Sequence, residues 1–182
     1  MSEQPMRPTR ALNAWGRLSH EPHQVLALAD RFEVQSRVQQ TTQPALPHGM
    51  GRSYGDVCLN PNGSVWLTTG LNKFIHFDAQ TGHLTAEAGV LLQDIQRTFV
   101  SQGWMLPVTP GTQFVTLGGA IANDVHGKNH HVLGTFGEHV QALELLRTDG
   151  TRLQLTRAQH ADWMQATIGG MGLTGLITQA TV

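Results

Sequence analysis

The chain of 182 residues is 40% hydrophobic and 14% charged, which predicts a globular protein with a buried core and excludes a disordered chain. Its formal net charge of −1, from 12 basic and 13 acidic residues with no run of Lys or Arg, argues against a nucleic-acid partner. The single cysteine, Cys58, excludes an internal disulfide, and no apolar run approaches the length of about 20 residues that crosses a bilayer. We therefore expect a cytoplasmic protein without a transmembrane segment.

The first part of the chain divides into a tail and a first lobe. We expect residues 1–11 to form a flexible tail. A short strand near residues 44–47, a glycine-rich loop over 49–56 and a strand over 65–68 belong to a lobe of residues 12–70. Before them, Ser19 or Glu21 with Pro22 is typical of a helix start, and apolar residues follow at helical spacing: Val25, Leu26, Leu28, Ala29 and Phe32.

Residues 71–182 form a second predicted lobe, in which strand pairs and helices alternate. The elements are, in chain order, a hairpin of strands 74–78 and 83–88, an amphipathic helix over 91–101 that ends at Gly103, a tightly packed helix start over 116–123, a hairpin of strands 140–147 and 151–155, a helix near 158–166 and a strand over 173–182. This mixture predicts an α+β fold. Because no capping or breaking residue ends the last strand before Val182, we expect the chain to continue into a further domain.

The first of three segments with chemical potential is the glycine-rich loop 49–56. Its backbone N–H groups lack obstruction by Cβ atoms, which suits the close approach of a pyrophosphate, although such loops are more often structural turns. Arg52 could neutralise a phosphate or bond to a carboxylate. A Rossmann site is not indicated, because Tyr54 stands where the third glycine of G-x-G-x-x-G belongs and no helix is predicted after Asp56.

The second segment, residues 107–124, contains the pair Gly118 and Gly119 at a predicted helix start. These glycines would let the helix N-terminus lie close to a bound group, or would let the helix pack closely on a sheet. Both interpretations are open.

The third segment, residues 125–131, contains His126, His130 and His131. Three histidines within six residues could bind a metal. However, His130 and His131 are adjacent, and Gly127 and Asn129 are poor helix residues, which disfavours three ligands on one face. Polar lining of a ligand cleft is the better interpretation, so no metal is expected.

Together, these segments resemble the FAD-linked oxidases of the vanillyl-alcohol oxidase/p-cresol methylhydroxylase superfamily, and within it the oxidases of a polyprenylphosphoryl ribose. The resemblance extends from about residue 12 onward and rests on residues 49–56, Pro110-Gly111-Thr112 and residues 116–131, with Trp15-Gly16 and residues 169–175 in agreement. Its most specific part is the string DVHGKNHH at residues 124–131.

The resemblance implies a PCMH-type FAD-binding domain of two α/β lobes, with the C-terminal substrate domain absent from these 182 residues. Many members bind FAD covalently through a histidine at the position of Arg52, so we expect non-covalent FAD. The residues implied in cofactor binding are Gly49, Met50, Gly51, Arg52, Ser53, Tyr54, Gly55, Asp56, Gly111, Thr116, Leu117, Gly118, Gly119, Asn123, Asp124, Val125, His126 and Ile177.

The activity implied is that of an FAD-dependent oxidoreductase of cell envelope biosynthesis. It would oxidise a sugar CH–OH group, the 2′-hydroxyl of a polyprenylphosphoryl ribose, by hydride transfer to flavin N5. The candidate catalytic residues are His126, beside the flavin ring, and Lys128, a cation for the substrate. The partners would be this small-molecule or lipid-linked sugar and the chain's own C-terminal substrate domain. Alternatives are a flavin reductase of the enolpyruvyl-glucosamine type, a non-catalytic FAD-binding module and a histidine-rich metal protein.

Overall fold

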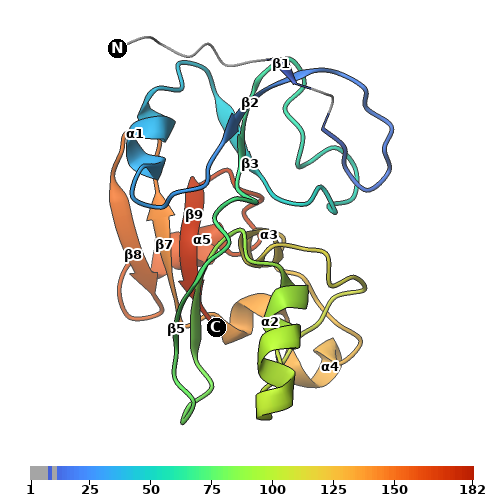
Figure 1. Cartoon of the computed structure of the whole chain (residues 1–182), viewed down its shortest axis with the longest axis vertical. Helices are drawn as coiled ribbons and strands as arrows, with labels where there is room; N and C mark the ends of the chain where they lie inside the picture. Colours follow the sequence, from blue (N-terminus) through green and yellow to red (C-terminus); the bar gives the residue numbers. More distant parts are fainter. Residues whose placement is uncertain (1–7, 10–11) are drawn as a thin grey trace.

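The computed structural model describes residues 8–9 and 12–182 and shows two lobes, each built on a β-sheet (Figure 1). The first sheet has the order β1 (Pro8–Thr9), β2 (His23–Ala27), β4 (Ser64–Leu67) and β3 (Ala45–His48). Strands β2 and β3 both run parallel to β4, so their carboxyl ends meet at one edge. The predicted flexible tail falls on residues 1–11, of which only 8 and 9 are described.

The prediction of a helix that starts at Ser19 or Glu21 is wrong. Residues 23–27 form β2, and the helix of this lobe, α1 (Val34–Gln39), comes later. The apolar residues of β2 do not alternate with polar ones, and periodicity cannot distinguish so short an apolar run from a helix. The helix α1 instead buries Val34 and Val38, which lie one turn apart.

The second lobe contains a five-stranded sheet in the order β5 (Phe74–Phe77), β6 (Leu84–Glu87), β9 (Leu176–Thr181), β7 (Ala142–Leu146) and β8 (Arg152–Thr156). All its pairings are antiparallel. The two predicted hairpins are β5–β6 and β7–β8. The strand β9 lies between them and joins them into one sheet. Together with the helices, these sheets confirm the predicted α+β fold.

Three helices of the second lobe, at residues 92–99, 117–122 and 161–167, follow the sequence pattern, whereas the short helical segments at 130–133 and 136–139 were not predicted. The helical segments are α2 (Leu92–Phe99) with the 3-10 turn η1 (Val100–Gln102), α3 (Leu117–Ala122), α4 (His130–Leu133), the 3-10 turn η2 (Phe136–His139) and α5 (Ala161–Thr167). Gly103 ends the second of these segments with a left-handed φ of 86°. None of the helices in the described residues is long and apolar enough to cross a membrane.

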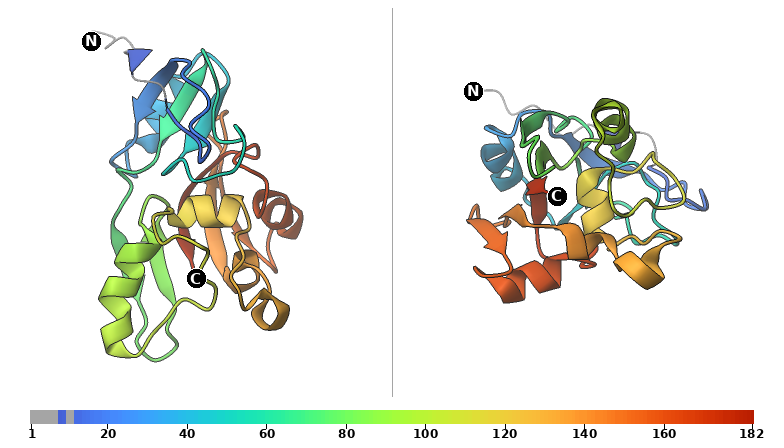
Figure 2. Two further views of the ribbon diagram at one scale, coloured as in Figure 1. Left: turned by 90° about the vertical axis from the view of Figure 1, so that its right-hand side faces the viewer. Right: turned by 90° about the horizontal axis from the view of Figure 1, so that it is seen from below.

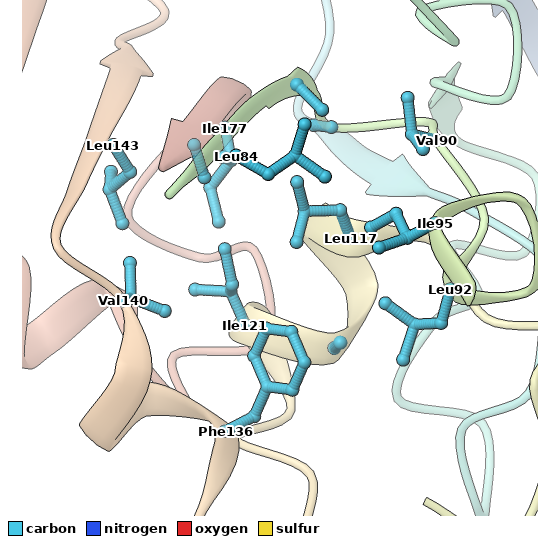
Figure 3. Packing of buried hydrophobic residues seen from close by; sticks show 14 of the residues in the cluster. Leu84, Val90, Leu92, Ile95, Leu117, Ile121, Phe136, Val140, Leu143 and Ile177 are labelled. Carbon is cyan, nitrogen blue, oxygen red and sulfur yellow. The ribbon is translucent and has the colours of Figure 1, made fainter. Parts of the chain in front are cut away.

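The core of the second lobe lies between its sheet and α2 and α3. Leu117 and Ile121, one turn apart on α3, are both fully buried. Figure 3 shows Leu117 beside Leu84 of β6 and Ile95 of α2, and Ile121 next to Phe136. This packing fixes the position and direction of the short helix α3, which lies where the two lobes meet (Figure 2).

The lobes are also joined on the side of α1. A second apolar cluster combines Val34, Val38 and Trp66 of the first lobe with Leu146 and Leu176 of the second. Beside it, Arg152 of β8 donates from Nε to Oε1 of Gln35, at 3.2 Å, and from Nη2 to the carbonyl oxygen of Arg31. The junction is therefore packed and hydrogen-bonded, which holds the opposite side of the lobes at a fixed separation.

Candidate functional site

A cleft of about 500 Å³ lies between the lobes. Its first wall is the carboxyl edge of the parallel strands, with His48 at the end of β3 and Thr68 after β4. Its second wall comes from α3, the loop before it and the start of β9. The carboxyl edge of parallel strands is a usual place for ligands in α/β folds. A smaller hollow of about 400 Å³ beside α2 shares residues 110–112 with this cleft.

The glycine-rich loop leaves β3 directly into the cleft. Gly51 has a φ of 62°, and a Cβ on it would overlap the carbonyl oxygen of Asn13, so both conformation and space require glycine here. Arg52 donates from Nη1 to the carbonyl oxygen of Met50, at 2.7 Å. The guanidinium is thereby held within its own loop, on the lining of the cleft.

The second glycine segment begins α3 at Thr116. The Thr116 hydroxyl accepts a hydrogen bond from the backbone N–H of Gly119, at 3.1 Å, and so caps the helix. A Cβ on Gly118 would lie 2.9 Å from Cβ of Ala88 on the neighbouring sheet segment. Gly118 is therefore needed for close helix-to-sheet packing, one of the two interpretations left open by the sequence, and it also lines the cleft.

The two segments touch across the cleft. Ser53 of the first loop donates from Oγ to Oδ1 of Asn123, at 3.1 Å, and Asn123 donates from Nδ2 to the carbonyl oxygen of Gly119, at 2.9 Å. This chain of hydrogen bonds links the glycine loop of the first lobe to the last turn of α3. The two halves of the cleft therefore have a defined relative position.

Asp124, directly after this helix end, organises the segment that follows. Its carboxylate accepts from the backbone N–H of Gly137, at 2.8 Å, and from the Thr135 hydroxyl, at 2.9 Å. Its φ of 42° lies in the left-handed region, which Asp tolerates better than most residues. The carboxylate therefore forms its hydrogen bonds with groups of the protein, although Asp124 also lines the cleft.

Most of the residues predicted for cofactor binding lie together on the cleft: Gly49, Met50, Gly51, Arg52, Ser53, Tyr54, Gly111, Thr116, Gly118, Gly119, Asn123, Asp124, Val125, His126 and Ile177. Gly55, Asp56 and Leu117 do not line it. Leu117 is turned into the core because α3 presents it, with Ile121, to the sheet. Gly55 and Asp56 lie between Tyr54 and Val57, which both line the cleft.

The two predicted catalytic residues differ in position. His126 lines the cleft and is exposed, whereas Lys128 is exposed outside it. The His126 ring is 5.3 Å from that of His130, centroid to centroid. Among the residues described, no group of three His, Cys, Asp or Glu side chains is arranged to hold a metal ion.

Trp15, which belongs to the family resemblance, lines the cleft. Four further cleft residues were not predicted from the sequence: His48, Val57, Cys58 and Thr68. They come from strand ends and a loop, and only the strand order brings them together. Met171 and Gly172 also line the cleft, from the segment 169–175 that supported the family resemblance. Burial lowers the pKa of His48 and raises the pKa of the Cys58 thiol, so both groups favour their neutral forms.

Comparison with known proteins gives this cleft a context. Residues 22–156 match a family model described as an FAD binding domain. The chain is 39% identical over 179 residues to a decaprenylphosphoryl-beta-D-ribose oxidase of Mycolicibacterium smegmatis, covering 96% of this chain and 39% of that relative. It is 28% identical to L-gulonolactone oxidase of Mus musculus, covering 88% of this chain and 36% of the relative. It is 26% identical to a D-lactate dehydrogenase of Anaerostipes hadrus, covering 76% and 30%. The chain thus spans about two-fifths or less of the length of these relatives.

Proposed function

This chain belongs to the family of FAD-binding domains, and from that premise we propose that it holds non-covalent FAD between lobes of residues 12–70 and 71–182. We further propose that it serves an oxidoreductase that oxidises a sugar CH–OH group, the 2′-hydroxyl of a polyprenylphosphoryl ribose. The observation that supports this most is the convergence of both glycine segments on one cleft. The substrate class is supported by the similarity to the decaprenylphosphoryl-beta-D-ribose oxidase, which covers 96% of this chain.

The cleft suits a long anionic cofactor in size and charge. Its volume of about 500 Å³ falls in the usual range of small-molecule sites. Among the described residues that line it, Arg52 is the only lysine or arginine and Asp124 is the only aspartate or glutamate. The Asp124 carboxylate accepts hydrogen bonds from Thr135 and Gly137, so its charge is stabilised by groups of the protein itself.

The residues of the two walls have separate tasks in this proposal. The backbone of residues 49–54, with Arg52, would bind the pyrophosphate, and Thr116 to Gly119 would bind the cofactor from the opposite wall. The hydrogen bond from Ser53 to Asn123 links these two walls. His126 would contact the flavin ring at its end of the cleft. Bound FAD would supply the hydride acceptor for oxidation of the carbinol carbon.

The sugar substrate needs contacts beyond those of the cleft. Lys128 is exposed near His126 in sequence, so its ammonium group is available to an anionic substrate from outside the cleft. The greater length of the relatives supports a substrate-binding domain that contributes the remaining contacts.

Titration with FAD tests the cofactor site directly. The protein should shift the absorbance spectrum of FAD and quench its fluorescence. Gly111→Trp should abolish both effects without loss of thermal stability, because no atom lies within 4 Å of a Cβ on this cleft residue. Ser101→Trp, on an exposed residue away from the cleft, is the matched control. Equal FAD binding by both variants would place the cofactor elsewhere.

Addition of a polyprenylphosphoryl ribose to the FAD-loaded protein without oxygen tests the reaction. Loss of the visible absorbance of oxidised flavin would show that the sugar has reduced the FAD, and would support oxidation of the sugar. Because the remaining substrate contacts are proposed to lie on a further domain, the same measurement on the protein that includes this domain decides the outcome. Unchanged flavin absorbance there would support a non-catalytic FAD-binding module.

A further inference from the structure

One buried polar side chain of the cleft has a hydrogen-bonding atom that the protein does not use. His48 lies at the carboxyl end of β3 and is 5% exposed. Its Nδ1 is 2.8 Å from the carbonyl oxygen of Cys58. Among the described residues, no hydrogen bond to its Nε2 is present.

The bond to Cys58 determines the form of the ring. A carbonyl oxygen can only accept, so Nδ1 carries the proton and donates it. Burial lowers the pKa of His48, and the other histidine whose charge opposes its protonation is His23 on β2. The ring is therefore neutral near pH 7, and Nε2 presents a lone pair as an acceptor.

The Nε2 atom lies close to a residue of the cleft lining. A Cβ on Gly51 would lie 3.3 Å from it, which places Nε2 beside the glycine loop. Both His48 and Gly51 line the cleft. Because no described residue forms a hydrogen bond with Nε2, a donor on a ligand in the cleft can pair with it.

We propose that His48 is a specificity-determining residue of the cleft, whose Nε2 accepts a hydrogen bond from a hydroxyl or amino group of the bound dinucleotide. This inference rests on the proposed FAD site. Ribose and ribityl hydroxyls and the adenine amino group are the donors that FAD offers. Phosphate oxygens cannot serve at pH 7, because they present no proton to a neutral imidazole.

Two substitutions separate this role from that of the Nδ1 group. In His48→Asn, the side-chain amide can occupy the Nδ1 position and bond to Cys58, but nothing replaces Nε2. In His48→Gln, the longer amide places an oxygen near the Nε2 position and loses the Nδ1 group. We expect His48→Asn to weaken FAD binding about 3- to 10-fold with little change in melting temperature. We expect His48→Gln to bind FAD within about twofold of wild type, with a lower melting temperature.

Fluorescence titration with FAD, and with ADP as a competing probe, gives the readout. Weaker binding of both probes by His48→Asn assigns the donor to the adenosine half, and weaker binding of FAD alone assigns it to the ribityl half. Wild-type affinity of His48→Asn for FAD, or an equal loss in folded His48→Gln and His48→Asn, would overturn the inference. Absence of FAD binding by wild type would instead refute the proposed function.

Discussion

Gly49 and Thr116 touch across the junction of the lobes, and a Cβ on Gly49 would lie 2.5 Å from Oγ1 of Thr116. The hydroxyl in question is the one that caps α3. The first residue after β3 and the first turn of α3 are thus in direct contact. A side chain at residue 49 would disturb the cap and the relative position of the lobes together.

We therefore expect Gly49→Ala to lower the free energy of unfolding by about 1 to 3 kcal/mol, as overpacking of a close contact does. Its affinity for FAD should fall as well. Urea unfolding and FAD titration measure the two effects. Gly111→Ala is the control for stability, because a Cβ there meets nothing within 4 Å. If the two alanine variants are equally stable, the contact between Gly49 and Thr116 is not close in solution.

Removal of the Asp124 carboxylate should loosen the segment between α3 and η2. Because it accepts from Gly137 and Thr135, we expect Asp124→Ala to cost about 2 to 3 kcal/mol of unfolding free energy. Thr135→Val, which removes only the hydroxyl partner, should cost about 1 kcal/mol. Chemical denaturation measures both. A cost for Asp124→Ala no greater than that for Thr135→Val would contradict the role of the bond to Gly137.

FAD should be released completely when the protein is denatured with acid. Arg52 stands at the position implied for the histidine of covalent relatives, and its guanidinium bonds to the Met50 carbonyl. After precipitation of the FAD-loaded protein, all flavin absorbance should be in the supernatant. Flavin that remains in the washed pellet would show a covalent link at another residue, and peptide mapping would identify it.

Acid should destabilise the protein through its buried histidines. Burial lowers the pKa of His23 and His48 in the folded state, whereas the unfolded chain keeps a histidine pKa of about 6.5. The stabilisation is complete above pH 6.5. It is lost as the pH falls toward the lowered folded-state values, because the unfolded chain binds protons first, with a slope of up to about 1.4 kcal/mol per pH unit for each histidine.

Urea unfolding measured from about pH 5 to about pH 8, a range around the ordinary histidine pKa, checks this dependence. His48→Gln should reduce the slope of stability against pH, because it removes one of the two groups. His20→Gln, on an exposed histidine, is the matched control and should leave the slope unchanged. Equal slopes for wild type and His48→Gln would show that His48 does not titrate at a lowered pKa.

The sequence predicts the second lobe better than the first for physical reasons. The antiparallel hairpins after residue 70 have clear turns, and α2 has strong helical periodicity, so local patterns were sufficient. The strand β2 is short and its apolar residues do not alternate with polar ones, so its sequence pattern does not distinguish a strand from a helix.

In the cleft, too, residues within short motifs could be predicted from the sequence, whereas residues brought together by the fold could not. Its glycines are predictable, because backbone conformation and close approach require them within short motifs. His48 and Thr68 become neighbours only through the order of β3 and β4, as the bond from the Thr68 hydroxyl to the His48 carbonyl oxygen shows. Leu117 belongs to a predicted motif, but its side chain is buried in the core. A motif does not specify which face of α3 packs on the sheet, and Leu117 lies on that face.

The central position of β9 has a consequence for the order in which the protein can fold during synthesis. The hairpins β5–β6 and β7–β8 are made early, yet they share the sheet only through residues 176–181. An isolated two-stranded hairpin is marginally stable in water. During synthesis the sheet of the second lobe can therefore close only after β9 has emerged from the ribosome, while the strands of the first lobe can pair as soon as β4 is complete.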